Sequence, residues 1–318
     1  MSIIDVFNGD ADGICALQQL RRANPADSQL VTGVKRDISL LKYVQAGEGD
    51  QVTVLDISLD KNRDDLIRLL DNGASVQYFD HHFPGEIPKH EALSTFIDTD
   101  TNVCTSLLVN QHLGGKFLSW AVTAAYGDNL FSAAEQAATP LGLSSDDLSE
   151  LKQLGICLNY NSYGASLDDL IFTPEDLYRL ISPYDDPFEF IRNEPDYQAL
   201  QHSYDSDIIH ANSISAFYED DSHALLILPD KKWARRVSGV FANDLAQKFP
   251  HRAHALLIDK EAGGYIISVR APLNNKTGAD ELCRQFPTGG GRKAAAGINS
   301  LPADIFDTFL QAFKSAFK

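Results

Sequence analysis

The stretch SIIDVFNGDADGICALQQLRRA, residues 2–23, opens the chain with an apolar run, a turn-rich loop and an amphipathic run. Residues 2–7 have the length and composition of a short strand, and NGDADG supplies turn-forming residues. Residues 14–23 are typical of a helix, so the chain begins with a strand–loop–helix unit. By the same criteria, further strands are expected at 30–34, 51–57, 75–80 and 94–99, and a helix at 61–73.

Strands that alternate with helices predict an α/β fold with a mostly parallel sheet and helices on both of its faces. We expect this N-terminal domain to span residues 1–190. Residues 191–222 belong to an acidic, proline-containing stretch that predicts an irregular linker. A second, smaller α/β domain is expected over 223–318, with an active-site cleft between the two domains.

The charge of the chain is unevenly distributed. Its 318 residues carry a net charge of −17, which disfavours a protein that coats nucleic acid. From Ser222 onward, however, there are 14 basic and 8 acidic residues, against 13 and 36 in the preceding part. This split predicts carboxylates for cations in the first domain and basic groups for an anion in the second.

The sequence also bears on the compartment. It contains no apolar run of the ~20 residues that a membrane span requires, and its first ten residues lack the basic start of a secretion signal. The four cysteines form no C-x-x-C pair, which argues against a zinc knuckle or a disulfide framework. We therefore expect a cytoplasmic protein with no membrane partner.

Acidic and imidazole side chains follow several predicted strands. Because functional groups gather beyond the carboxyl ends of the strands in an open parallel sheet, these side chains are expected at one edge. Carboxylates packed together repel one another unless a cation lies among them, and oxygen with imidazole ligands suits Mn²⁺ or Mg²⁺. The residues are Asp10, Asp12, Asp56, Asp80, His81 and His82, joined by Asp128 at the end of an apolar stretch.

An EF-hand calcium loop is an alternative for the first of these segments, since Asn8, Asp10, Asp12 and Gly13 match its start. Its twelfth position would be Gln19, which cannot supply the bidentate carboxylate that the loop needs. The preceding residues also predict a strand where that motif requires a helix. We therefore reject the calcium loop.

The ordered set of motifs resembles the DHH phosphoesterase superfamily, which includes RecJ exonucleases, nanoRNases, cyclic-dinucleotide phosphodiesterases and exopolyphosphatases. The family's name-giving motif matches Asp80-His81-His82, and its D-x-D pair matches Asp10 and Asp12. Its two single-aspartate motifs match Asp56 and Asp128. Any one of these motifs is weak evidence, but the order and spacing of all of them agree.

The resemblance extends to the C-terminal segment. The family's DHH-associated domain has a strand that ends in arginine, matched by Arg270, and a glycine-rich loop. We expect that loop to bring backbone N–H groups and the start of a following helix close to a phosphate. Arg270 and Arg292 would complete the phosphate site. The matching loop residues are Gly289, Gly290, Gly291 and Arg292. No G-K-[ST] follows, so the loop is not a Walker motif.

Two positions depart from the family pattern. Asn8 stands where the family often has a histidine or aspartate that binds one of its metal ions. An amide is a poorer ligand, so we expect that ion to bind weakly or to contact Asn8 through a water. Arg292 replaces a loop histidine. It can bind phosphate bidentately, but it cannot titrate near neutral pH.

The resemblance implies two divalent ions, with Mn²⁺ preferred over Mg²⁺. One ion would be held by Asp10 and Asp56. The other would be held by Asp12, Asp56, His81 and Asp128, with Asp56 bridging both ions. His82 would face the scissile phosphate as a donor or proton carrier, and Asp80 would orient an imidazole.

These features together predict a Mn²⁺-dependent phosphodiesterase that hydrolyses short linear oligonucleotides, above all 5′-phosphorylated dinucleotides such as pGpG or pApA, to 5′-mononucleotides. Long nucleic acid is disfavoured because the acidic first domain would repel it. One alternative is a phosphatase that acts on polyphosphate or on 3′-phosphoadenosine 5′-phosphate. Another is an inactive metal- or nucleotide-binding regulator, suggested by Asn8 and Arg292. The sequence leaves a homodimer open.

Overall fold

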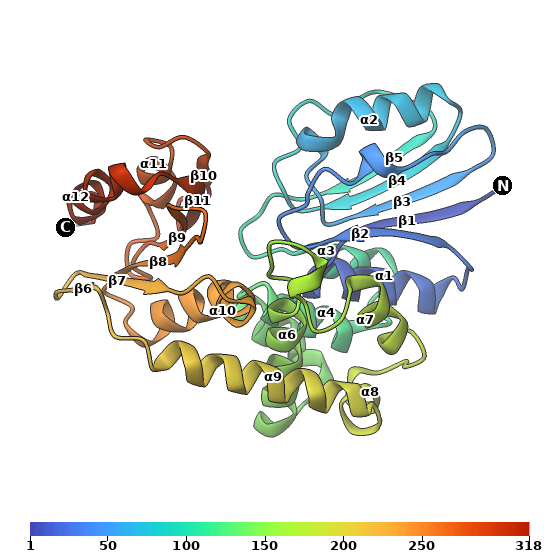
Figure 1. The fold of residues 1–318 in the computed structure, drawn as a ribbon. Coiled ribbons are helices and arrows are strands. Elements are labelled where there is room, and N and C mark those ends of the chain that lie inside the picture. Colours follow the sequence, from blue (N-terminus) through green and yellow to red (C-terminus); the bar gives the residue numbers. More distant parts are fainter. Residues whose placement is uncertain (318) are drawn as a thin grey trace. The chain divides into compact units, whose positions relative to one another are not determined.

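The computed structural model describes residues 1–317, and the chain divides into two compact units, Met1–Gln201 and His202–Lys318 (Figure 1). Each unit contains its own sheet and its own hydrophobic core. The division falls within the residues that the sequence assigns to the linker. Each unit is described in turn.

The first unit is built on a five-stranded sheet in the order β2-β1-β3-β4-β5, with every neighbouring pair parallel. The predicted parallel sheet is therefore confirmed. The chain order reverses between β1 and β3, and in such sheets ligands bind beyond the carboxyl ends of the strands at that point. The strands are β1 (Ile3–Asn8), β2 (Gln29–Gly33), β3 (Gln51–Leu55), β4 (Ser75–Asp80) and β5 (Leu93–Ile97).

Helices cover both faces of this sheet (Figure 1). Helix α2 (Leu59–Asp71) packs its apolar side, with Leu66 and Leu69, into one core cluster together with Val52 and Val54 of β3. Helices α1 (Ala11–Ala23) and α3 (Thr105–His112) contact the strands from the other face. The β-branched strand residues predict this burial, because both faces of a parallel sheet are covered.

The remaining helices of the first unit pack outside α1. A Cβ atom on Gly127 would lie 2.7 Å from the carbonyl oxygen of Gly155, so only glycine permits α4 and α6 to approach this closely. This contact fixes the end of α4, where Asp128 follows. The helices are α4 (Leu118–Gly127), α5 (Phe131–Ala138), α6 (Ser145–Tyr160), α7 (Pro174–Ile181) and α8 (Pro187–Asn193).

The predicted irregular linker is wrong. Most of residues 191–222 belongs to α9 (Pro195–Asn212), a regular helix. Pro187 and Pro195 each stand at the first position of a helix, where the missing N–H is not needed and the fixed φ suits the helix. The prolines therefore mark helix starts, and they do not break the chain into coil.

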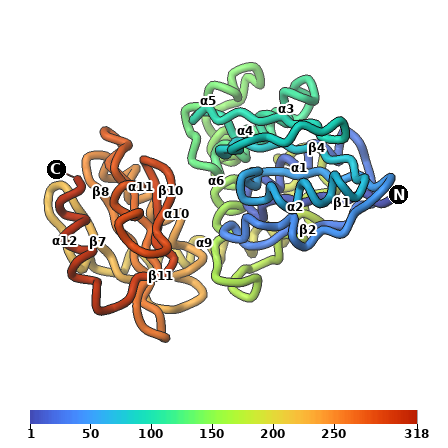
Figure 2. Tube along the Cα trace, turned by 90° about the horizontal axis from the view of Figure 1, so that it is seen from above, coloured from blue at the N-terminus to red at the C-terminus, as the bar shows by residue number. Residues whose placement is uncertain are grey.

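The second unit contains a six-stranded sheet in the order β10-β11-β9-β8-β7-β6. Strands β7 and β8 are parallel and joined by α10, and the other pairs are antiparallel. Helix α10 lies on one face of this sheet and α12 on the other (Figure 2). The elements are β6 (Tyr218–Glu219), β7 (His223–Leu228), α10 (Lys232–Lys248), β8 (Ala253–Asp259), β9 (Tyr265–Arg270), α11 (Ala279–Cys283), β10 (Gly289–Gly291), β11 (Ala295–Leu301) and α12 (Phe306–Ala316).

The predicted glycine loop with a helix after it is also wrong. Gly289–Gly291 form strand β10, which pairs with β11 in a tight hairpin, so that the element directly after the glycines is a strand and not a helix. A Cβ atom on Gly289 would lie 1.8 Å from the carbonyl oxygen of Cys283, and one on Gly291 2.5 Å from the Cα of Ala296. Gly289 and Gly291 are therefore needed for close packing of the hairpin, whereas a Cβ atom on Gly290 would meet nothing within 4 Å.

No helix within residues 1–317 is long and apolar enough to cross a bilayer.

Candidate metal centre

The predicted residues of the first unit converge at the carboxyl edge of its sheet. Asp10 follows β1 and caps α1, where its Oδ1 accepts the backbone N–H groups of Asp12 and Gly13, both at 3.1 Å. Gly13 is required there, because a Cβ atom would lie 2.2 Å from the carbonyl oxygen of Asn8. The strand–loop–helix unit thus turns so tightly that both aspartates of the D-x-D pair lie at the sheet edge.

Asp12 is buried on the first turn of α1 and binds the start of α3. Its Oδ2 accepts the N–H of Thr105 and its Oδ1 that of Ser106, both at 2.7 Å. Burial raises the pKa of Asp12, and the Asp128 carboxylate raises it further. The Asp12 carboxylate therefore holds the start of α3 and also lies near the negative charge of Asp128.

Asp56 ends β3 in an unusual backbone conformation. Its φ is +59°, in the left-handed region that costs a non-glycine residue free energy, and this is why β3 stops at Leu55 and not at residue 57. The side chain is 2% exposed and accepts a hydrogen bond from Thr105 Oγ1 at 3.1 Å. Burial raises the pKa of Asp56 well above its usual range, and Asp10 and Asp12 add to this effect.

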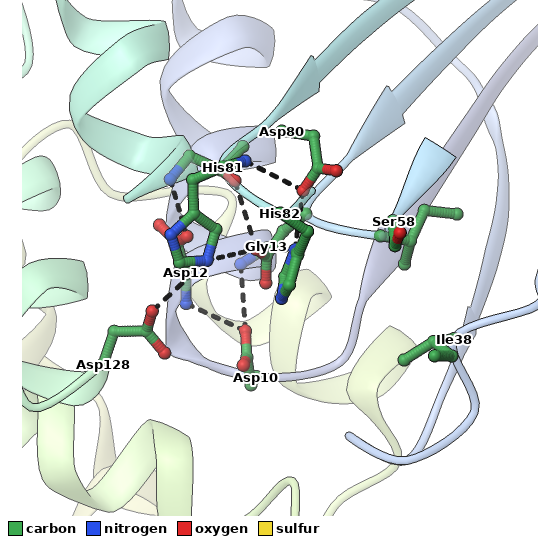
Figure 3. Close-up of polar contacts among 12 residues, drawn as sticks. Asp10, Asp12, Gly13, Ile38, Ser58, Asp80, His81, His82 and Asp128 are labelled. Carbon is green, nitrogen blue, oxygen red and sulfur yellow. Dashed lines mark hydrogen bonds and ion pairs between the residues drawn. The ribbon is translucent and has the colours of Figure 1, made fainter. Parts of the chain in front are cut away.

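His81 lies at the centre of the cluster (Figure 3). Its Nδ1 lies 2.8 Å from the carbonyl oxygen of Val103, and only a protonated Nδ1 can donate to a carbonyl. In the neutral ring the lone pair is therefore on Nε2, which lies 3.4 Å from Asp56 Oδ1 and 3.5 Å from Asp128 Oδ2. Burial lowers the pKa of His81, but the surrounding carboxylates, Asp56 foremost, outweigh it and raise the pKa to about 10.

His82 and Asp80 form a pair beside this cluster. Asp80 Oδ1 lies 2.7 Å from His82 Nδ1 and accepts the backbone N–H of His81 at 2.9 Å. With the proton on Nδ1, the neutral His82 ring has its lone pair on Nε2, which is the nitrogen that can accept a proton or a hydrogen bond. Asp80 is fully buried, whereas the His82 side chain is 29% exposed.

Two overlapping groups in this cluster have donor atoms within 4.8 Å of one another. One consists of Asp56, His81 and His82, and the other of Asp12, His81 and Asp128. Mixed carboxylate and imidazole donors of this kind fit a divalent ion such as Mn²⁺. Figure 3 shows Asp12 and Asp128 close to the His81 ring, with Asp80 beside His82.

Two residues that the sequence analysis missed also lie here. Lys35 follows the end of β2, and its Nζ lies 2.5 Å from Asp10 Oδ2 and 2.9 Å from Asn159 Oδ1. Lys35 could have been found, because it leaves the same sheet edge as the aspartates. Asn159 lies in α6, and nothing in the sequence indicates its contact with Lys35. Asn8 is 4% exposed, and its Oδ1 accepts no hydrogen bond from the described residues.

The predicted anion-binding residues of the second unit lie in one row of its sheet. Arg270 pairs with Ala295 across β9 and β11, and Ala295 exchanges backbone hydrogen bonds with Arg292 across the hairpin turn. Residues paired in this way point to the same face of a sheet, with a small alanine between the two arginines. Arg270 Nε donates to Asn243 Oδ1 of α10 at 2.7 Å, which places this face on the α10 side.

Comparison with known proteins agrees with this architecture. Residues 221–318 match the DHHA1 domain. A crystal structure of exonuclease RecJ bound to manganese superposes with a TM-score of 0.65 at 18% identity, covering 99% of this chain and 89% of that chain. The chain has the two-domain fold of the DHH superfamily. The recognition made from the sequence is therefore confirmed at the level of the fold and of the DHH-associated domain.

Two other solved structures share this DHH fold. RecJ from Thermus thermophilus in complex with Mn²⁺ has a TM-score of 0.66 at 19% identity, and this chain spans 51% of its length. A pGpG-specific phosphodiesterase, PggH from Vibrio cholerae, has a TM-score of 0.56 at 14% identity, with 99% of this chain and all of that chain covered. No curated protein sequence matches the chain.

Proposed function

We propose that this protein is a Mn²⁺-dependent phosphodiesterase that hydrolyses short linear oligonucleotides, especially 5′-phosphorylated dinucleotides, to 5′-mononucleotides. The observation that carries the proposal is the position of His81 Nε2 between the carboxylates of Asp56 and Asp128, beside a second imidazole oriented by Asp80. The similarity of the fold to a manganese-bound exonuclease and to a pGpG-specific phosphodiesterase supports it.

Four residues would hold the ion: Asp12, Asp56, His81 and Asp128. A divalent ion in such a site lowers the pKa of a bound water and stabilises negative charge on phosphate oxygens. The hydrogen bond from His81 Nδ1 to Val103 keeps Nε2 directed at the carboxylates. The left-handed backbone of Asp56 directs its carboxylate to the same point.

His82 is proposed to contact the scissile phosphate. Because Asp80 binds Nδ1, the exposed side of the ring presents Nε2, which can donate a hydrogen bond to a phosphate oxygen or carry a proton to the leaving group. Donation from Nε2 requires the form of the ring in which both nitrogens carry a proton. This role for His82 continues the prediction made from the sequence.

The second unit is proposed to bind the 5′-phosphate of the substrate. Arg270 and Arg292 lie in one row of the sheet on one face, and two guanidinium groups suit a phosphate that does not react. Gly289 and Gly291 then contribute by bringing β10 close to its neighbours, which fixes the start of the turn that carries Arg292, whereas a Cβ atom on Gly290 would meet open space. That the reacting phosphate and the bound phosphate lie in one cleft stays a prediction.

The test is a substrate panel assayed with Mn²⁺ and analysed by chromatography. We expect kcat/KM to fall steeply from a 5′-phosphorylated dinucleotide to a 20-mer, because a long strand must pass an acidic surface. Removal of the 5′-phosphate should also weaken the dinucleotide. Equal rates on the dinucleotide and the 20-mer would contradict the preference for short substrates. A preference for polyphosphate or 3′-phosphoadenosine 5′-phosphate would identify a phosphatase.

A further inference from the structure

Lys35 places a cation inside the carboxylate cluster. Its Nζ lies 2.5 Å from Asp10 Oδ2, 2.9 Å from Asn159 Oδ1 and 3.4 Å from Asp128 Oδ1. An ammonium group has three N–H donors, and three oxygen acceptors surround it here. Lys35 therefore interacts with its oxygen neighbours much as a bound cation would.

The position of Lys35 is fixed at both ends of the residue. Its backbone N–H donates to the carbonyl oxygen of Ser162 at 2.9 Å, just beyond α6. Asn159, which binds the ammonium, is 2% exposed on α6. The backbone and the ammonium group of Lys35 are therefore both held by the C-terminal end of α6.

The donors that remain beside Lys35 are poor ones for a second divalent ion. Asp10 Oδ1 caps α1, and Asp10 Oδ2 contacts the Lys35 ammonium group, so Lys35 occupies the position that an ion bound to Oδ2 would take. Asn8 offers a buried oxygen without a hydrogen bond among the described residues, but an amide brings no charge to offset a second dication.

The two groups of possible ligands in the cluster can hold only one ion between them. Both depend on His81, whose Nδ1 is engaged by Val103, so that only Nε2 can bind an ion. The nearby Nδ1 of His82 is engaged by Asp80 at 2.7 Å. One lone pair on Nε2 serves one ion, and that ion is the one held with Asp12 and Asp128.

We propose that the protein binds a single divalent ion, and that the ammonium group of Lys35 takes the place of a second ion beside Asp10. This inference rests on the proposed function and replaces the expectation of two ions drawn from the family resemblance. Asp10 then acts by holding Lys35, and Asn159 is a positioning residue for the same ammonium group.

The experiment measures Mn²⁺ binding directly, without substrate. Mn²⁺ is titrated into the full-length protein by calorimetry, the bound metal is counted by elemental analysis, and the Mn²⁺ environment is recorded by electron paramagnetic resonance. Lys35→Met removes the charge and keeps much of the stem. Lys35→Arg keeps a cation at the position. Lys42→Met is the matched control, since Lys42 is exposed and lies 3.7 Å from Asp37, outside the cluster.

We expect one Mn²⁺ per chain with the spectrum of an isolated ion in the wild type, in Lys35→Arg and in Lys42→Met. Lys35→Met should gain a second ion, because the oxygens of Asp10, Asn159 and Asp128 then lack their cation, and its spectrum should show two coupled ions. Circular dichroism checks that the variant is folded.

Two coupled ions in the wild-type protein would overturn the inference, and this result does not depend on any variant. A folded Lys35→Met protein that still binds one ion would also overturn it, because the lysine would not then be what excludes the second ion. Either result leaves the proposed phosphodiesterase intact. The absence of bound Mn²⁺ from the wild type would instead refute the proposed function itself.

Discussion

The hydrogen bond between Asp80 and His82 gives a sharp test of the proposed role of His82. Asp80→Asn keeps the size of the side chain and removes its charge. A hydrogen bond to a charged group contributes about 1 to 1.5 kcal/mol more than a neutral one, which corresponds to about tenfold in rate. If the asparagine turns its N–H₂ group to the ring, His82 must also change its tautomer, and the loss grows. We therefore expect kcat to fall by about 10- to 100-fold.

The metal site should survive this change. Asp80 contacts His81 through the backbone N–H at 2.9 Å, whereas the proposed metal-binding atom of that residue is Nε2. Mn²⁺ affinity measured by calorimetry should therefore change little, and KM should change less than kcat. The matched control is Asp98→Asn, because Asp98 follows the neighbouring strand β5, is exposed, and accepts the N–H of Asp100 at 2.9 Å.

The assay is steady-state hydrolysis of a 5′-phosphorylated dinucleotide at saturating Mn²⁺. An Asp80→Asn protein with wild-type kcat would show that His82 needs no orientation by a carboxylate, and the proposed role of the pair would fail. A loss of Mn²⁺ affinity equal to the loss of kcat would place Asp80 in the metal site instead.

Three further predictions concern single residues. Asp56→Ala should abolish turnover, measured with the same substrate, while circular dichroism shows an intact fold; retention of more than a few per cent of activity would contradict the assignment of Asp56 to the metal site. Arg292→Ala should raise KM by roughly 10- to 150-fold with a smaller change in kcat, because it removes a charge-assisted contact to a non-reacting phosphate; Arg179→Ala is the control, because Arg179 is exposed and pairs with Glu175 of its own helix. His254 is 1% exposed, and burial lowers its pKa from 6.5 to about 4. The unfolded chain therefore takes up a proton at a higher pH than the folded chain, which lowers the free energy of unfolding of the second unit as the pH falls. The expected loss is about 2 kcal/mol between pH 7.5 and pH 5, and about 3 kcal/mol in total below pH 4. Hydrogen exchange in β8, corrected for the pH dependence of intrinsic exchange, should show this loss in the wild type and a smaller one in His254→Leu; an equal loss in both would rule out His254 as its source.

The sheet and most of the candidate site could be predicted from the sequence for one physical reason. Parallel strands that alternate with helices bring their carboxyl ends to one edge, so Asp10, Asp56 and His81 had to meet once the strands were identified. The side chain of Lys35 reaches the same edge by the same rule. It was missed because lysine is not a metal-ligand type, and only its position shows that it contacts Asp10.

Other parts of the molecule could not be predicted because tertiary contacts decide them. Gly289 and Gly291 suit a flexible loop as well as a strand, and the choice depends on how close the backbone of Cys283 and Ala296 comes. Asn159 and Thr105 are ordinary helix residues in the sequence, and their contacts with the cluster arise only from how α6 and α3 pack. The linker was mistaken for coil because Pro195 breaks a helix from within but favours its first position.

The two hydrogen bonds from Asp12 to the start of α3 affect how sequences with this fold should be interpreted. A chain that has lost its ion-dependent chemistry would still need a carboxylate at this position, because the backbone N–H groups of Thr105 and Ser106 would otherwise be buried without an acceptor. An aspartate that matches Asp12 is therefore poor evidence that a distant relative is active. The better diagnostic positions are His81 and Asp128, whose ring nitrogen and carboxylate face each other.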